Sequence, residues 1–321
     1  MERAPVLIIG YNRLDLIKEQ IEFCVSHNRR VIISIDGPRD SNDLGAINTG
    51  NYVRLLEAKE PNWLFGVEVR EQNLGCRFGV PASISSAFEY SDSLIILEDD
   101  IVCQPLFFDY MDIALEEFRF NTEIFAINTW NPLPRRPSEY GNVFLSRHFS
   151  PWGWGTWKDR WANYDVDMSS FDRGESVRAL ATLRTYKLNY LYERLLKRKL
   201  IQCYEGYNTW DYQLMYAMWR IGAKVVNSVP RLSGNQGFDE RATHTKQALS
   251  HIDAEIYENL WFEDSVQNLS SLSILNAEES KSLDYAIDRI LLNFDTKSKA
   301  SYLQWAYRNL KKIVCNLSSN R

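Results

Sequence analysis

The first half of the chain alternates short apolar runs with segments of helical periodicity. Residues 6–11, 31–36 and 94–97 are dominated by apolar side chains, which is typical of strands buried on both faces of a sheet. Between the first two runs, in residues 14–24, apolar side chains recur at helical spacing. This alternation predicts an α/β fold in which a mostly parallel sheet carries helices on both faces.

The second half of the chain is less regular, and its last part is helical throughout. The expected elements before residue 250 are strands at 142–149 and 223–229 and helices at 176–201 and 210–221. Later helices are expected at 253–262, 278–293 and 300–317. We therefore expect one domain over residues 1–250, followed by a helical C-terminal extension over residues 251–321.

Composition excludes several classes of protein. The chain has 321 residues, of which 45% are apolar and 25% charged, so it is neither a disordered chain nor a small disulfide-stapled one. The net charge of −5 argues against a nucleic-acid-binding protein. Five scattered cysteines, with no signal peptide and no long apolar segment, favour a cytoplasmic location.

An acidic triplet, Glu98-Asp99-Asp100, follows the apolar run 94–97. Three adjacent carboxylates repel one another unless a positive charge compensates them. Carboxylate oxygens are ligands that Mn²⁺ or Mg²⁺ prefers, so the triplet is a candidate site for a metal that binds a diphosphate. The alternative is a solvated strand end that caps the next helix.

Two further segments carry candidate ligand-binding residues. Asp36 ends the run 31–36 and has the chemistry to accept a hydrogen bond from a nucleobase, or to form a turn with Gly37. The loop 73–79 contains two glycines and Arg77, which suit phosphate oxygens unless the loop is an ordinary connection. The chain contains neither GxGxxG after the first strand nor a P-loop motif, which disfavours dinucleotide oxidoreductases and P-loop enzymes.

A tryptophan-rich segment and a glycine-rich segment complete the candidates. Residues 150–157 place Trp152, Gly153 and Trp154 together, as expected for the wall of a sugar-binding cleft or for a hydrophobic plug. Residues 233–244 are expected to form a flexible loop that closes over a bound donor. Its His244 is a candidate metal or phosphate ligand, or a structural histidine.

Taken in order, these motifs resemble nucleotide-sugar glycosyltransferases of the GT-A fold. The likeness covers about residues 4–245 and is carried by six segments: 5–13, 35–37, 98–100, 107–110, 127–131 and 149–155. The triplet resembles the EDD form of the metal motif in the N-acetylglucosaminyltransferase I and protein O-mannose N-acetylglucosaminyltransferase branch. The resemblance implies a Rossmann-like GT-A fold, with a donor half at about 1–130 and an acceptor half at about 131–250.

The resemblance also implies a role for each matching residue. Asp100 would ligate the metal that bridges the donor diphosphate, Asp99 would touch the transferred sugar, and Glu98 would touch the ribose. Asp211, which otherwise reads as a first-turn helix acid, would be the general base of an inverting reaction. The remaining implied contacts are Asp36 with uracil, Tyr11, Asn12, Arg13 and Arg77 with the nucleotide, and Trp210 with the sugar wall.

The implied function is transfer of a sugar, such as N-acetylglucosamine, from a UDP-sugar to a hydroxyl of a glycan or glycolipid, in bacterial polysaccharide assembly. Two alternatives remain open: a sugar nucleotidyltransferase, and a non-catalytic carbohydrate-binding protein of the same fold. Separately, residues 297–321 combine six basic side chains with an apolar stripe. That pattern suits either peripheral contact with an anionic membrane or a helix docked on the domain.

Overall fold

The computed structural model describes residues 3–133, 142–172, 190–237 and 271–295. Within them, eight strands form one sheet in the order β3-β2-β1-β4-β8-β6-β9-β7. A small second sheet pairs β5 (Ile101–Cys103) with β10 (Ser233–Asn235) in antiparallel fashion. The strands of the large sheet are β1 (Val6–Gly10), β2 (Val31–Ile35), β3 (Leu64–Val69), β4 (Ser93–Glu98), β6 (Ile124–Asn128), β7 (Val143–Ser146), β8 (Trp154–Trp157) and β9 (Lys224–Ser228).

Most of the large sheet is parallel. Strands β1 to β4 run in one direction, and β6 is parallel to β9. Strand β8 lies antiparallel between β4 and β6, and β7 is antiparallel to β9 at the edge. The predicted fold class is confirmed in its main features: the chain is an α/β protein with a mostly parallel sheet that carries helices on both faces.

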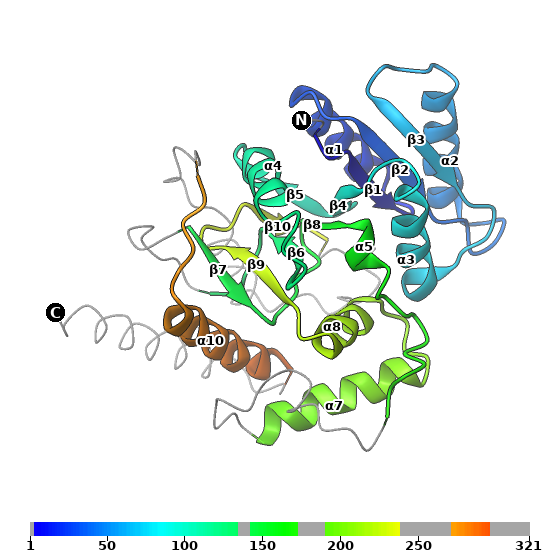
Figure 1. The fold of residues 1–321 in the computed structure, drawn as a ribbon. Helices are drawn as coiled ribbons and strands as arrows, with labels where there is room; N and C mark the ends of the chain where they lie inside the picture. The colour runs from blue at the N-terminus through cyan, green and yellow to red at the C-terminus, as the bar shows by residue number, and fades with distance from the viewer. Residues whose placement is uncertain (1–2, 134–141, 173–189, 238–270, 296–321) are drawn as a thin grey trace.

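Helices cover both faces of the sheet, which is why its inner strands are apolar throughout (Figure 1). On β1, Leu7 and Ile9 belong to the apolar cluster that includes residues of α3, α7 and α8, while Val6 and Ile8 belong to a second cluster that includes residues of α1 and α4. The helices are α1 (Leu14–Ser26), α2 (Leu44–Glu57), α3 (Gly75–Ala87), α4 (Phe107–Glu117), α5 (Lys158–Trp161), α7 (Tyr190–Tyr204), α8 (Asp211–Arg220) and α10 (Ala277–Asp295).

The structure corrects the expected organisation in two places. The segment 150–157 contributes β8, a strand in the middle of the sheet, rather than a cleft wall alone. The segment predicted as a closing loop begins with a strand, β10. The predicted helices at 253–262 and 300–317, and the proposed membrane contact at 297–321, lie outside the described residues.

A buried ionic network attaches α10 to the edge of the sheet, where the helix lies beside β7 (Figure 1). Asp288 is fully buried and lies 2.7 Å from Nε2 of His148, and it also forms an ion pair with Arg147. Asp284 accepts a hydrogen bond from Ser146 and lies 3.5 Å from Nη1 of Arg147. The C-terminal helix is therefore held by paired charges as well as by apolar packing.

Each helix in the described part of the chain is too short or too polar to cross a lipid bilayer.

Candidate functional site

Polar side chains lie together at the carboxyl ends of three neighbouring parallel strands. Residues 11–13 follow β1, Asp36 follows β2, and residues 98–100 lie at and after the end of β4. All of them line a cavity of about 600 Å³. Ligands of open α/β sheets bind beyond the carboxyl ends of the strands, so this cavity is the candidate site.

Arg13 compensates part of the acidic triplet. Its side chain is almost fully buried, and Nη1 lies 3.1 Å from Oδ1 of Asp99 and 3.0 Å from Oδ2 of Asp100. The backbone N–H of Tyr11 also donates to Asp99. Arg13 therefore holds the two aspartates together at the floor of the cavity.

One arginine does not neutralise three acids. Burial and the neighbouring charges of Asp100, Asp99 and Asp211 raise the pKa of Glu98 well above its ordinary value, although a hydrogen bond from Trp210 opposes this. Burial and the charge of Asp100 raise the pKa of Asp99 to about 7, against the lowering effect of Arg13. Both shifts show that the acids of the triplet crowd one another beyond what Arg13 compensates, so their charged forms are disfavoured while no further cation is present.

Asp211 reaches the same cavity from another direction. It is the first residue of α8, and its Oδ1 accepts hydrogen bonds from Oγ1 of Thr209 and from the backbone N–H of Tyr212. Within the described residues, no hydrogen bond is donated to Oδ2. The side chain is half-buried, so one carboxylate oxygen is oriented by the protein and the other is open to a ligand.

Asp36 lines the cavity, and its carboxylate is already engaged with the backbone. Oδ1 accepts from the N–H groups of Gly37 (3.0 Å) and Leu74 (2.9 Å), and Oδ2 accepts from Gly75 (2.9 Å) at the start of α3. Besides its contact with Gly37, the carboxylate thus ties the end of β2 to the start of α3. Contact with a nucleobase stays a prediction, for which Oδ2 retains a lone pair.

The structure corrects the predicted placement of Arg77, which does not line the cavity. Its guanidinium is buried and donates to the carbonyl oxygens of Cys203, Tyr207 (3.4 Å) and Val166 (2.9 Å). Its backbone N–H donates to Asn208, 3.0 Å away. Arg77 therefore ties α3 to the segment between α7 and α8 instead of facing phosphate.

Replacing Arg77 by Met should lower stability and leave ligand affinity unchanged. The substitution keeps the apolar stem but leaves buried carbonyl oxygens unpaired, so we expect the free energy of unfolding to fall by about 3 kcal/mol. Urea unfolding measures this loss, and nucleotide titration supplies the second readout. An unchanged free energy of unfolding together with weaker nucleotide binding would instead support the predicted contact between Arg77 and phosphate.

The tryptophans predicted as a sugar wall divide into two groups. Trp152 is half-buried and lines the cavity, as does the edge of the largely buried Trp210. Trp154, on β8, is fully buried and stacks on Trp210 with ring centroids 5.7 Å apart, so the structure places it in the core instead. Gly153 has φ +78° and packs beside Phe107 and Thr129, away from the cavity lining.

Three cationic side chains of the cavity were not predicted: Arg39, Arg70 and Lys199. Arg70 is paired with Glu68 at 2.8 Å, and Arg39 lies over the ring of Tyr11, 5.1 Å from its centroid. Only Arg70 had a signal in the sequence, because it directly follows a strand. The lining holds five carboxyl groups and four cationic side chains.

The donor set suits a divalent metal that is completed by its ligand. In the described part of the chain, no three His, Cys, Asp or Glu side chains are grouped around one metal position, and His244 lies outside that part. Mg²⁺ and Mn²⁺ commonly bind through one or two carboxylates plus substrate phosphates, without an all-protein cage. Asp100, half-exposed in the cavity beside Asp99, fits that kind of site.

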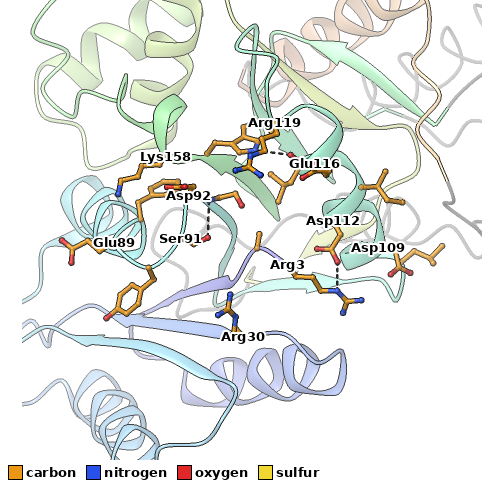
Figure 2. Close-up of a pocket in the computed structure, with 18 residues that line it drawn as sticks. Arg3, Arg30, Glu89, Ser91, Asp92, Asp109, Asp112, Glu116, Arg119 and Lys158 are labelled. Carbon is orange, nitrogen blue, oxygen red and sulfur yellow. Dashed lines mark hydrogen bonds and ion pairs between the residues drawn. The ribbon is translucent and has the colours of Figure 1, made fainter. Parts of the chain in front are cut away.

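A second, larger cavity of about 1140 Å³ lies at the amino ends of β1, β2 and β4 (Figure 2). Its charged side chains have both signs and come from α4, from the start of α5 and from the segments that precede β1, β2 and β4. Arg3 lies 3.4 Å from Asp112, and Glu89, Asp92 and Lys158 line the other side. None of the predicted site residues that the structure describes lies here.

Comparison with known proteins gives a distant likeness only. No protein-family model and no curated protein matches the chain. Among solved structures, a mannose-1-phosphate geranyltransferase from Thermus thermophilus aligns over 71% of this chain and 74% of its own, with 10% identity and a TM-score of 0.37. A glycosyltransferase involved in the glycosylation of the major capsid of PBCV-1 aligns over 61% and 76%, with 10% identity and a TM-score of 0.24.

Proposed function

We propose that this chain is an inverting, metal-dependent glycosyltransferase that moves a sugar from a UDP-sugar to a hydroxyl of a glycan or glycolipid. One observation carries the proposal. The acidic triplet after β4 and Asp211 at the start of α8 line the same cavity from two separate elements. A displacement at a sugar carbon needs one group for the departing diphosphate and another for the incoming hydroxyl.

Asp211 acts as the general base. Its open Oδ2 takes the proton of the acceptor hydroxyl while the acceptor oxygen forms a bond to the anomeric carbon. The bond from that carbon to the diphosphate oxygen breaks, and the diphosphate leaves with the electron pair. Thr209 and the N–H of Tyr212 hold Oδ1, which orients the base before the substrate binds.

The charge of the cavity supports a metal. A diphosphate brings further negative charge into a lining that already has five carboxylates. Arg13 and Arg70 are paired with acids of the protein. A divalent ion held by Asp100, with Asp99 beside it, would neutralise charge on the leaving diphosphate. UDP and the bacterial polysaccharide setting rest on the sequence resemblance alone.

Thermal unfolding with ligands tests donor and metal together. UDP with Mn²⁺ should raise the melting temperature more than either alone, because a ligand at 100 times its Kd stabilises the folded state by about 2.7 kcal/mol. Asp100→Ala should remove the part of the shift that depends on Mn²⁺. An equal rise in melting temperature for UDP with and without Mn²⁺ would contradict the proposed metal site.

Product analysis separates the alternatives. A glycosyltransferase releases UDP from a UDP-sugar, whereas a nucleotidyltransferase releases pyrophosphate from a nucleoside triphosphate. A carbohydrate-binding protein releases neither.

A further inference from the structure

Residues 235 and 236, which follow β9 in the chain, contact Asp100 through its backbone and its side chain. In the small sheet, Asn235 of β10 is opposite Ile101 of β5. The backbone N–H of Gln236 donates to the carbonyl oxygen of Asp100 at 2.8 Å. A part of the chain more than 130 residues away therefore fixes the backbone on which Asp100 is carried.

Asn235 also holds the side chain of Asp100. Its Nδ2 donates to Oδ1 of Asp100 at 3.1 Å, while Arg13 donates to Oδ2 at 3.0 Å. Exchanging the amide's oxygen and nitrogen positions would break both of its hydrogen bonds, because its Oδ1 accepts a hydrogen bond from the backbone N–H of Gly237 at 2.7 Å. Each oxygen of Asp100 thus has its own donor.

Gly237 leaves the space that Asp100 occupies. A Cβ atom built on Gly237 would lie 2.0 Å from Oδ2 of Asp100 and 2.7 Å from its Cβ and Cγ. The φ of Gly237 is outside the left-handed region, so this position needs glycine for room and not for backbone conformation. Gly237 and Asn235 both line the cavity.

We propose that Asn235 and Gly237 are positioning residues that set the orientation of the Asp100 carboxylate toward the diphosphate metal. The inference rests on the proposed function, in which Asp100 is the metal ligand. Groups that orient a metal ligand commonly change metal affinity 10- to 100-fold when they are replaced. The pair also gives the segment 235–237 a role that its polar, glycine-rich sequence did not indicate.

The test is Mn²⁺ binding to the full chain in the presence of UDP, measured by electron paramagnetic resonance. Gly237→Ala and Asn235→Ala should each weaken Mn²⁺ binding by about 10-fold or more. Gly50→Ala is the matched control, since it adds a methyl group 2.9 Å from Cγ1 of Val69, and neither residue lines the cavity. That variant should leave Mn²⁺ affinity unchanged. Wild-type affinity in both test variants would overturn the inference.

Crystal structures of the variants without metal give a second readout. In Gly237→Ala, Oδ2 of Asp100 should move away from the added methyl group and lose its contact with Arg13. An unmoved carboxylate in that variant would also overturn the inference. If the wild-type chain binds no Mn²⁺, the proposed function fails, whereas the position of Asp100 in these crystals still decides the role of Asn235 and Gly237. Circular dichroism and the melting temperature show whether each variant is folded.

Discussion

Asp211→Asn should lower the kcat of sugar transfer by roughly 10²- to 10⁴-fold, the usual contribution of a general base. The amide has the same shape as the carboxylate, and its oxygen still accepts from Thr209 and from the N–H of Tyr212. It cannot take up the proton of the acceptor hydroxyl. The KM for the donor and the melting temperature should therefore stay near the wild-type values.

The measurement is UDP release from a UDP-sugar in the presence of Mn²⁺ and an acceptor. Asp92→Asn is a matched control, because this exposed aspartate lines the cavity at the amino ends of β1, β2 and β4. It should retain full activity. Transfer by Asp211→Asn within a few-fold of the wild-type rate would exclude Asp211 as the base.

Asp288→Ala should reduce the free energy of unfolding by about 3–5 kcal/mol, the usual cost of removing one partner from a buried ion pair. Asp288 is fully buried, and its loss leaves Arg147 and His148 as buried groups that face no carboxylate at that position. Asp284 compensates only in part, since it lies 3.5 Å from Nη1 of Arg147. The loss should loosen α10 from the edge of the sheet.

Urea unfolding followed by tryptophan fluorescence measures this effect. Lys281→Ala, on the exposed side of the same helix, serves as the control and should change stability by no more than about 0.5 kcal/mol. A loss below about 1 kcal/mol in Asp288→Ala would mean that the network does not hold the helix.

The first half of the fold was predictable because its strands are buried on both faces. Such strands must be apolar, so β1, β2 and β4 are visible as runs of apolar residues. Strand β8 is also buried, but it was hidden because it is not a run of apolar residues. It contains Gly155 and Thr156 between two tryptophans, and Gly155 lets the backbone pack closely, since a Cβ there would lie 3.0 Å from the carbonyl oxygen of Leu94 on the adjacent strand.

The candidate site was predictable where a residue directly follows a parallel strand. Asp36 and Asp100 are examples, because the ends of parallel strands meet at one edge of the sheet. The direction of a loop side chain is not encoded in this way. Arg77 and Trp154 belong to segments with suitable composition, yet their side chains turn into the interior, where the carbonyl oxygens of residues 166, 203 and 207 and the ring of Trp210 receive them.

Long-range contacts explain what was missed. Asn235 contacts Asp100 only because β10 pairs with β5, and Lys199 reaches the cavity only because α7 lies beside α8. The strand pairing has no local signal, since β5 and β10 are distant in the sequence.

The most direct test is a crystal of the chain soaked with Mn²⁺ and UDP, with the anomalous signal of manganese recorded. We expect one manganese peak in the cavity at the end of β4, bound by Asp100 and by oxygens of the UDP diphosphate. A well-ordered UDP elsewhere on the molecule, or UDP in this cavity with no manganese beside Asp100, would contradict it.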